Sequence, residues 1–197
     1  MEMTGEQLIH ASQADTWTAL NDPEMLKACV PGCESIERAS DTGFVVQMTA
    51  RVGPVSAKFK GKLNLSNIKP PHSYSIAFEG QGGVAGFARG GADVSLAPEG
   101  NATRLGYKVK ANVGGKLAQI GSRLVDAAAS KVANDFFAAF NEKVAALHGG
   151  HGAQAHAAHH PEPVPRDPDL PQVSESALSF FAAGALVVFV VALMTLL

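Results

Sequence analysis

The sequence predicts an α+β domain with a helix-grip fold, in which a curved antiparallel sheet wraps around one long C-terminal helix. Two observations predict this fold. Apolar and polar residues alternate in successive segments between residues 43 and 113, and residues 114–147 repeat apolar residues at spacings of three and four. A third observation concerns residues 177–197, which contain no charged residue and predict a single transmembrane helix. The chain of 197 residues thus divides into a domain (1–147), a flexible linker (148–176) and a C-terminal anchor (177–197).

Charge and the N-terminal sequence set the expected location. The chain has a formal net charge of −2, and the linker, with four acidic residues and one arginine, holds −3, which leaves the domain at +1. A nearly neutral domain does not have the basic surface that nucleic-acid binding needs. The first ten residues have neither the basic nor the apolar region of a secretory signal. We therefore expect a cell-membrane protein with a single-pass anchor and its domain on the cytoplasmic side.

The N-terminal segment predicts a short strand followed by two short helices. Residues 4–9 are the expected strand. Ser12 followed by Asp15 resembles a capping box at the start of a helix. Pro23 breaks the helical pattern into two pieces, and the sequence "PGC" closes them with a turn.

Five alternating segments then predict the sheet, at residues 43–52, 55–66, 73–80, 92–98 and 103–113. One face is apolar and the other carries a row of lysines and arginines, so we expect an antiparallel sheet with one face in water. The glycine-rich stretch "GQGGVAGFARGG" (80–91) fits G-x-G-x-x-A, but a strand follows it rather than a helix. We interpret these glycines as points of sheet bending, and the hairpin carrying Phe87 as a segment that could form the mouth of a cavity.

The C-terminal helix places its apolar residues in a stripe that must pack on the inner face of the sheet. The expected stripe is Leu117, Ile120, Leu124, Ala128, Val132, Phe136, Phe140, Val144 and Leu147. Small residues on both partners predict an apolar cavity between sheet and helix, and the alternative is a filled core. The expected lining is Phe44, Met48, Phe59, Leu63, Tyr74, Ile76, Phe78, Phe87, Leu105, Tyr107, Ile120, Leu124, Ala128, Phe136 and Phe140.

Catalytic and metal sites are not indicated by the sequence. Inward positions of the domain pair no carboxylates and set no nucleophile beside a base. Cys29 and Cys33 are interpreted as free thiols in a reducing compartment. Five of the seven histidines fall in the linker, where no rigid element would hold them around a metal. We expect no catalytic residue, no metal and no covalent cofactor.

Four stretches of the domain resemble a known family. They are "LNDPEMLKACVPGCES", "VGPVSAKFKGKL", "GQGGVAGFARGGADVSL" and "VGGKLAQIGSRLVDAAASKVANDFFAAF". They are similar to the CoxG-like family of proteins of aerobic carbon monoxide dehydrogenase, within the Bet v 1/START-like (SRPBCC) superfamily. The resemblance implies a helix-grip fold, an apolar ligand pocket and association with the molybdenum-containing dehydrogenase at the membrane. A related molybdenum hydroxylase is the alternative partner.

These observations lead to one hypothesis and two alternatives. The hypothesis is a membrane-tethered accessory protein that recruits aerobic CO dehydrogenase and takes an apolar ligand from the membrane lipid and quinone pool. We expect this ligand to be a respiratory quinone of the menaquinone or ubiquinone type, whose carbonyl could accept a hydrogen bond from Tyr107. The first alternative is a membrane-recruitment adaptor with a filled core. The second is an enzyme of the same superfamily that acts on an apolar substrate.

Overall fold

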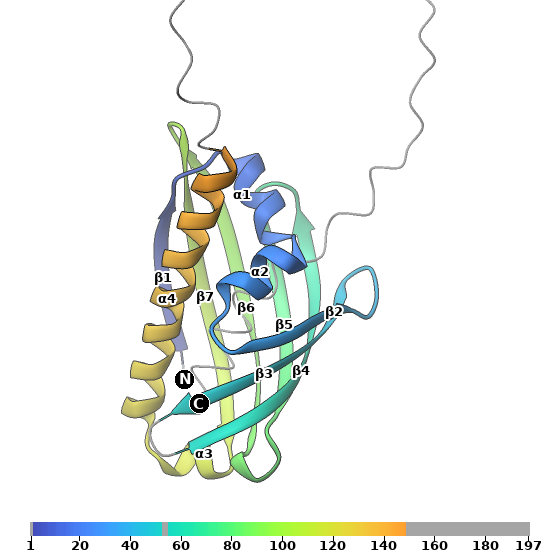
Figure 1. The fold of residues 1–197 in the computed structure, drawn as a ribbon, viewed down its shortest axis with the longest axis vertical. Coiled ribbons are helices and arrows are strands. Elements are labelled where there is room, and N and C mark those ends of the chain that lie inside the picture. Colours follow the sequence, from blue (N-terminus) through green and yellow to red (C-terminus); the bar gives the residue numbers. More distant parts are fainter. Residues whose placement is uncertain (1, 53–54, 149–197) are drawn as a thin grey trace, which may run out of the picture.

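The computed structural model describes residues 2–52 and 55–148, which form a curved sheet with helices on its concave face (Figure 1). The strands are β1 (Glu2–Ile9), β2 (Cys33–Arg38), β3 (Gly43–Val52), β4 (Val55–Lys69), β5 (Ser73–Gln81), β6 (Phe87–Glu99) and β7 (Ala102–Gly114). The helices are α1 (Gln13–Leu20), α2 (Pro23–Cys29), η1 (Gly83–Ala85, a 3₁₀ turn), α3 (Lys116–Gln119) and α4 (Ser122–His148). The predicted helix-grip domain is confirmed.

The sheet has seven antiparallel strands in the order β1-β7-β6-β5-β4-β3-β2. β1 pairs with β7, so the first strand of the chain closes the edge that the last strand would otherwise expose. The alternation predicted for β3, β4, β5, the 92–98 part of β6 and β7 is confirmed, since their apolar residues face the helices and the lysines of β4 and β7 face outward. The other edge strand, β2, was not predicted from the sequence.

The two short helices begin as the sequence predicts. The Ser12 side chain accepts a hydrogen bond from the backbone N–H of Asp15 at the start of α1. Asp22 caps α2 in the same way, and Pro23 occupies the first turn, where a missing N–H costs nothing. α1 and α2 close one end of the sheet and pack beside the C-terminal half of α4 (Figure 1).

The C-terminal helix differs from the prediction in its first half. The chain forms two helices rather than one, because Gly121 adopts a left-handed backbone conformation (φ +95°) between α3 and α4. The buried residues of α4 are Val125, Ala129, Ala133, Phe136, Phe137, Phe140 and Val144. Leu124 and Leu147, which the predicted stripe included, are 54% and 64% exposed.

The pitch of a helix explains this correction. A run of four-residue steps drifts by about 40° per step, because each residue turns ~100°. The predicted stripe runs from Phe140 back to Leu124 in steps of four residues. Over these steps the position moves from the sheet side of α4 to the solvent side. Val125 and Ala129 stay on the buried side.

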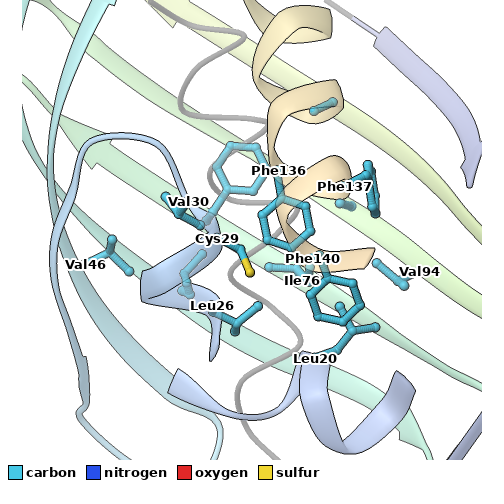
Figure 2. Packing of buried hydrophobic residues seen from close by; sticks show 14 of the residues in the cluster. Leu20, Leu26, Cys29, Val30, Val46, Ile76, Val94, Phe136, Phe137 and Phe140 are labelled. Atoms are coloured by element: carbon cyan, nitrogen blue, oxygen red, sulfur yellow. The ribbon is translucent and has the colours of Figure 1, made fainter. Parts of the chain in front are cut away.

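The core lies where α4, α1 and α2 meet the sheet (Figure 2). Phe136 stacks on Phe140 with ring centroids 5.5 Å apart, and contacts the edge of Phe137 at 5.2 Å. Figure 2 shows these rings beside Leu26 and Cys29 of α2. Burying three phenylalanines of one helix is what holds α4 against the sheet.

Within residues 2–52 and 55–148, every helix is too short or too polar to cross a bilayer. The predicted anchor (177–197) lies outside the described residues. So does the predicted linker, apart from His148, which ends α4.

Candidate ligand-binding site

Most of the predicted lining residues lie together between the sheet and α4. Ten of the fifteen are buried, with side chains at most 4% exposed: Phe44, Met48, Phe59, Leu63, Tyr74, Ile76, Phe78, Leu105, Phe136 and Phe140. Three more, Tyr107, Ile120 and Ala128, are partly buried against the same cluster. Leu124 and Phe87 are exposed, so the structure does not bring them to the interior.

Phe87 lies on the outer face of the sheet. Ala88, Ala92, Val94 and Leu96 of β6 are buried, so the positions that alternate with them, beginning with Phe87, point the other way. The Phe87 ring rests against the backbone of Gly114, where an added Cβ would lie 2.2 Å from the ring. Phe87 therefore covers the outside of the β6–β7 pair instead of facing into a cavity.

Tyr107 lies on the inner face at the edge of the core. Its ring stacks on Phe137 with centroids 5.6 Å apart. It also lies over Gly5 of β1, where an added Cβ would be 2.4 Å from the Tyr107 hydroxyl oxygen. Burial raises the pKa of Tyr107, so the hydroxyl keeps its proton at neutral pH and can donate it in a hydrogen bond.

Two further hydroxyl groups lie deeper than that of Tyr107. Tyr74 is 3% exposed and meets the edge of Trp17 at 5.6 Å, and complete burial raises its pKa strongly. Thr16 of α1 is fully buried, and its hydroxyl oxygen has no hydrogen-bond partner among the residues that the structure describes. The sequence analysis missed Thr16. Its spacing of four residues from Leu20 was the signal that it faces the core.

A cleft opens at the end of the domain where α4 begins. It has a volume of about 350 Å³ and lies between β7 and the junction of α3 with α4. It is lined by Glu2, Ala111, Asn112, Val113, Ala118, Ser122, Val125 and Asp126. Ala111 and Val125 belong to the buried faces of β7 and α4, so the cleft reaches from solvent to the edge of the interior.

Two larger grooves, of about 560 and 550 Å³, are lined by polar residues of the outer face, such as Ser75, Asp93, Lys62 and Arg89. Their walls suit polar molecules, whereas the cleft beside α4 borders the apolar interior. We therefore take the cleft and the interior behind it as the candidate ligand-binding site.

A comparison with protein families shows which family the chain belongs to. Residues 5–145 match the family of CoxG, one of the subunits of carbon monoxide dehydrogenase. The chain belongs to the CoxG family. A search of the curated proteins gave no match.

Solved structures share the fold of this CoxG-family domain. A conserved protein from Geobacillus kaustophilus is 28% identical, with a TM-score of 0.70, and the match covers 74% of this chain and 96% of that one. Zhui aromatase/cyclase from Streptomyces sp. R1128 is 11% identical, with a TM-score of 0.56 and coverages of 78% and 99%. Ara h 8.0201 is 14% identical, with a TM-score of 0.53 and coverages of 74% and 98%. These likenesses place the CoxG-family domain in the Bet v 1/START-like fold.

Ion pairs neutralise part of the basic outer face of this CoxG-family domain. Lys58 pairs with Glu34 at 3.0 Å and Lys110 with Glu2 at 2.9 Å. Lys110 lowers the pKa of Glu2, and a hydrogen bond from the Thr49 hydroxyl, together with Lys58, lowers the pKa of Glu34. Arg104 bridges Glu6 and Glu99, at 3.3 and 2.7 Å. Lys60, Lys62 and Lys108 have no ion pair within the described part of the chain.

The two cysteines are free thiols, as predicted. Burial raises the pKa of Cys29 and of Cys33 to about 11, so both thiols are protonated at neutral pH. The described residues contain no group of three or more histidine, cysteine or acidic side chains that could hold a metal ion.

Proposed function

We propose that this CoxG-family protein is a membrane-tethered accessory protein of aerobic, molybdenum-containing CO dehydrogenase. It recruits the enzyme to the membrane and binds an apolar ligand, a respiratory quinone of the menaquinone or ubiquinone type. In this way it links CO oxidation to the respiratory chain. Family membership supports the partner, and the charge-free segment 177–197 supports the tether.

The observation that carries the ligand class is the aromatic and aliphatic interior between α4 and the sheet, with a cleft leading to its edge. An isoprenoid tail resists entering water by about 0.8 kcal/mol per methylene group, and an apolar interior removes that barrier. The residues present fit a carbonyl headgroup as well. The Tyr107 hydroxyl can donate to it, and the buried Thr16 hydroxyl lacks a partner in the described structure.

A recruitment adaptor with a filled core is the second candidate. Phe136 and Phe140 are fully buried and stacked on each other, as in an interior that needs no guest. The two candidates differ in one respect: a carrier must open space between α4 and the sheet, whereas an adaptor keeps this space closed.

Co-purification tests the proposal on the full-length protein. The protein is extracted from membranes in detergent, and bound quinone is measured by solvent extraction and mass spectrometry. Ala133 is 1% exposed and faces the sheet from α4, so Ala133→Leu fills the space a ligand would use. Ala127 is exposed on the same helix, so Ala127→Leu is the matched control.

We expect quinone with the wild type and with Ala127→Leu, and a severalfold lower amount with a folded Ala133→Leu. Equal amounts in all three would mean that the quinone came from the micelle. If none of the three proteins carries quinone, the recruitment adaptor with a filled core is the candidate that remains. CO dehydrogenase should appear in the membrane fraction only when this protein is present. If the enzyme is missing from the membrane fraction of cells that contain this protein, recruitment is contradicted under either candidate.

A further inference from the structure

One end of the domain exposes two apolar side chains close together in the chain. Val84 of η1 is 84% exposed and Phe87 at the start of β6 is 45% exposed. We call these two residues the tip. Exposed apolar side chains that gather at one place, rather than singly, mark a surface that meets a partner or a membrane.

Contacts place the tip beside β7 and α3. The Phe87 ring lies on Gly114, at the end of β7. An added Cβ at Gly115 would lie 2.5 Å from the Cα of Gly86, so the turn after η1 touches the start of α3. α3 is followed by Gly121 and then by the first turn of α4. Figure 1 shows α3 and the first turn of α4 at the same end of the molecule as the β5–β6 connection.

Basic side chains lie at the same end of the domain as the tip. Lys116 is on α3, which contacts η1, Arg123 is in the first turn of α4, and Arg89 is two residues from Phe87 on the same face of β6. Each of the three is exposed and has no ion pair within residues 2–52 and 55–148. The acidic residues nearby are Glu79, opposite Arg89 in the sheet, and Glu2 and Asp126 in the cleft, of which Glu2 is paired with Lys110. The surroundings of the tip are therefore net positive.

Apolar side chains ringed by cations match a bilayer surface that carries anionic headgroups. Anionic headgroups would supply counterions to Lys116, Arg123 and Arg89, and the predicted anchor (177–197) would hold the domain beside such headgroups. Charge complementarity thus selects a lipid surface.

We infer that the tip docks on anionic lipid headgroups and inserts Val84 and Phe87 into the bilayer interface. The inference deepens the proposed function and rests on it for its purpose, because Ala118, Ser122 and Val125 of the adjoining helices line the cleft. A docked tip brings that cleft to the bilayer, so an apolar ligand passes to the interior without crossing water.

The length of the chain beyond α4 permits this orientation. α4 has 27 residues, about 40 Å, and it ends at His148 at the opposite end of the domain from the tip. Residues 149–176 can span at most ~95 Å when fully extended. They are therefore long enough to run back along the domain and let the predicted anchor and the tip share one membrane.

Tryptophan fluorescence of the full-length protein in vesicles tests the docking. Val84→Trp places a reporter at the tip, and Leu147→Trp places one at the opposite end of α4, where the side chain is 64% exposed. The vesicles contain brominated phosphatidylcholine, with or without phosphatidylglycerol. We expect quenching and a blue shift of Val84→Trp that strengthen with phosphatidylglycerol, and neither change for Leu147→Trp. The native Trp17 is 7% exposed and supplies a constant background.

Charge reversal gives the second measurement. Combined with Val84→Trp, the changes Lys116→Glu and Arg123→Glu should abolish the effect of phosphatidylglycerol, whereas Lys143→Glu on the distal part of α4 should leave it intact. If bromine does not quench Val84→Trp, the inference is wrong. It is also wrong if the emission changes only with protein concentration, because the tip would then bind a second molecule of this protein. Quinone co-purification with an unquenched tip would contradict the docking alone. A quenched tip without bound quinone would contradict the carrier alone.

Discussion

At the scale of single residues, Phe136 distinguishes a filled interior from a hollow one. It is fully buried between Phe137 and Phe140. In a filled core, Phe136→Ala should lower the free energy of unfolding by about 3–5 kcal/mol. Leu124→Ala on the same helix, at 54% exposure, should cost about 0.5 kcal/mol or less. Urea unfolding of the full chain followed by circular dichroism measures both changes, and a small cost at Phe136 would reveal space that the neighbouring rings do not fill.

The second residue-scale prediction concerns the pH at which Cys33 reacts. Only the thiolate is nucleophilic, and burial raises the pKa of this thiol to about 11. Alkylation by iodoacetamide at pH ~8 should be about 100-fold slower in the folded protein than in the urea-unfolded chain, where thiols have a pKa of ~8.5. The folded-state rate should keep rising tenfold per pH unit until pH approaches 11. Mass spectrometry of Cys33→Ser separates the reaction of Cys29, and a rate that levels off near pH ~8.5 would contradict the buried placement.

At the scale of elements, Gly121 determines where α4 begins. Its φ of +95° lies in the left-handed region, and an added Cβ would meet nothing within 4 Å. Gly121→Ala should therefore cost about 1–2 kcal/mol through backbone conformation alone. Gly121→Asn should cost less, since asparagine tolerates left-handed conformations. Equal unfolding midpoints for all three proteins would show that α3 and α4 can join as one helix.

The elements also show what the sequence could predict. Alternation identified β3, β4, β5, the 92–98 part of β6 and β7, and the face that each turns to the core, because a period of two leaves little choice once one face is apolar. Phe87 was expected at the mouth of a cavity as part of a glycine-rich hairpin, and this was wrong, because pairing with β7 puts Phe87 on the outer face. The sequence analysis missed β2, a short edge strand of mixed polarity. It misplaced the stripe of α4 because four-residue steps drift around the helix, and it expected one helix where Gly121 separates α3 from α4.

The candidate site was predictable to a similar extent. The buried aromatic wall followed from apolar patterning. The buried Thr16 hydroxyl and the cleft beside α4 depend on how side chains fill volume in three dimensions, and hydropathy along a chain contains no such information. The basic surroundings of the tip likewise combine residues from α3, α4 and β6, which only the fold brings to one end.

At the scale of the whole molecule, α4 ends at His148 at the opposite end of the domain from the tip, and α4 is about 40 Å long. A domain held by a short tether would present its α1–α2 end to the bilayer, because α4 ends there. For the tip to reach the same bilayer, the chain between α4 and the predicted anchor must cover the length of the domain. The 28 residues of 149–176 have a coil dimension of roughly 30 Å and can extend further.

Shortening this segment should therefore turn the domain, so that its α1–α2 end meets the membrane in place of the tip. Deleting residues 153–172 leaves 8 residues, with a coil dimension of roughly 16 Å and a limit of ~27 Å, which is shorter than α4. In brominated vesicles the full chain with this deletion should lose the quenching of Val84→Trp and gain quenching of Leu147→Trp. Replacing residues 153–172 with a glycine–serine sequence of equal length should restore the wild-type pattern, because length rather than composition sets the reach. If the deletion leaves the tip quenched, the linker does not set the orientation, and the tip must reach the bilayer with the domain lying flat.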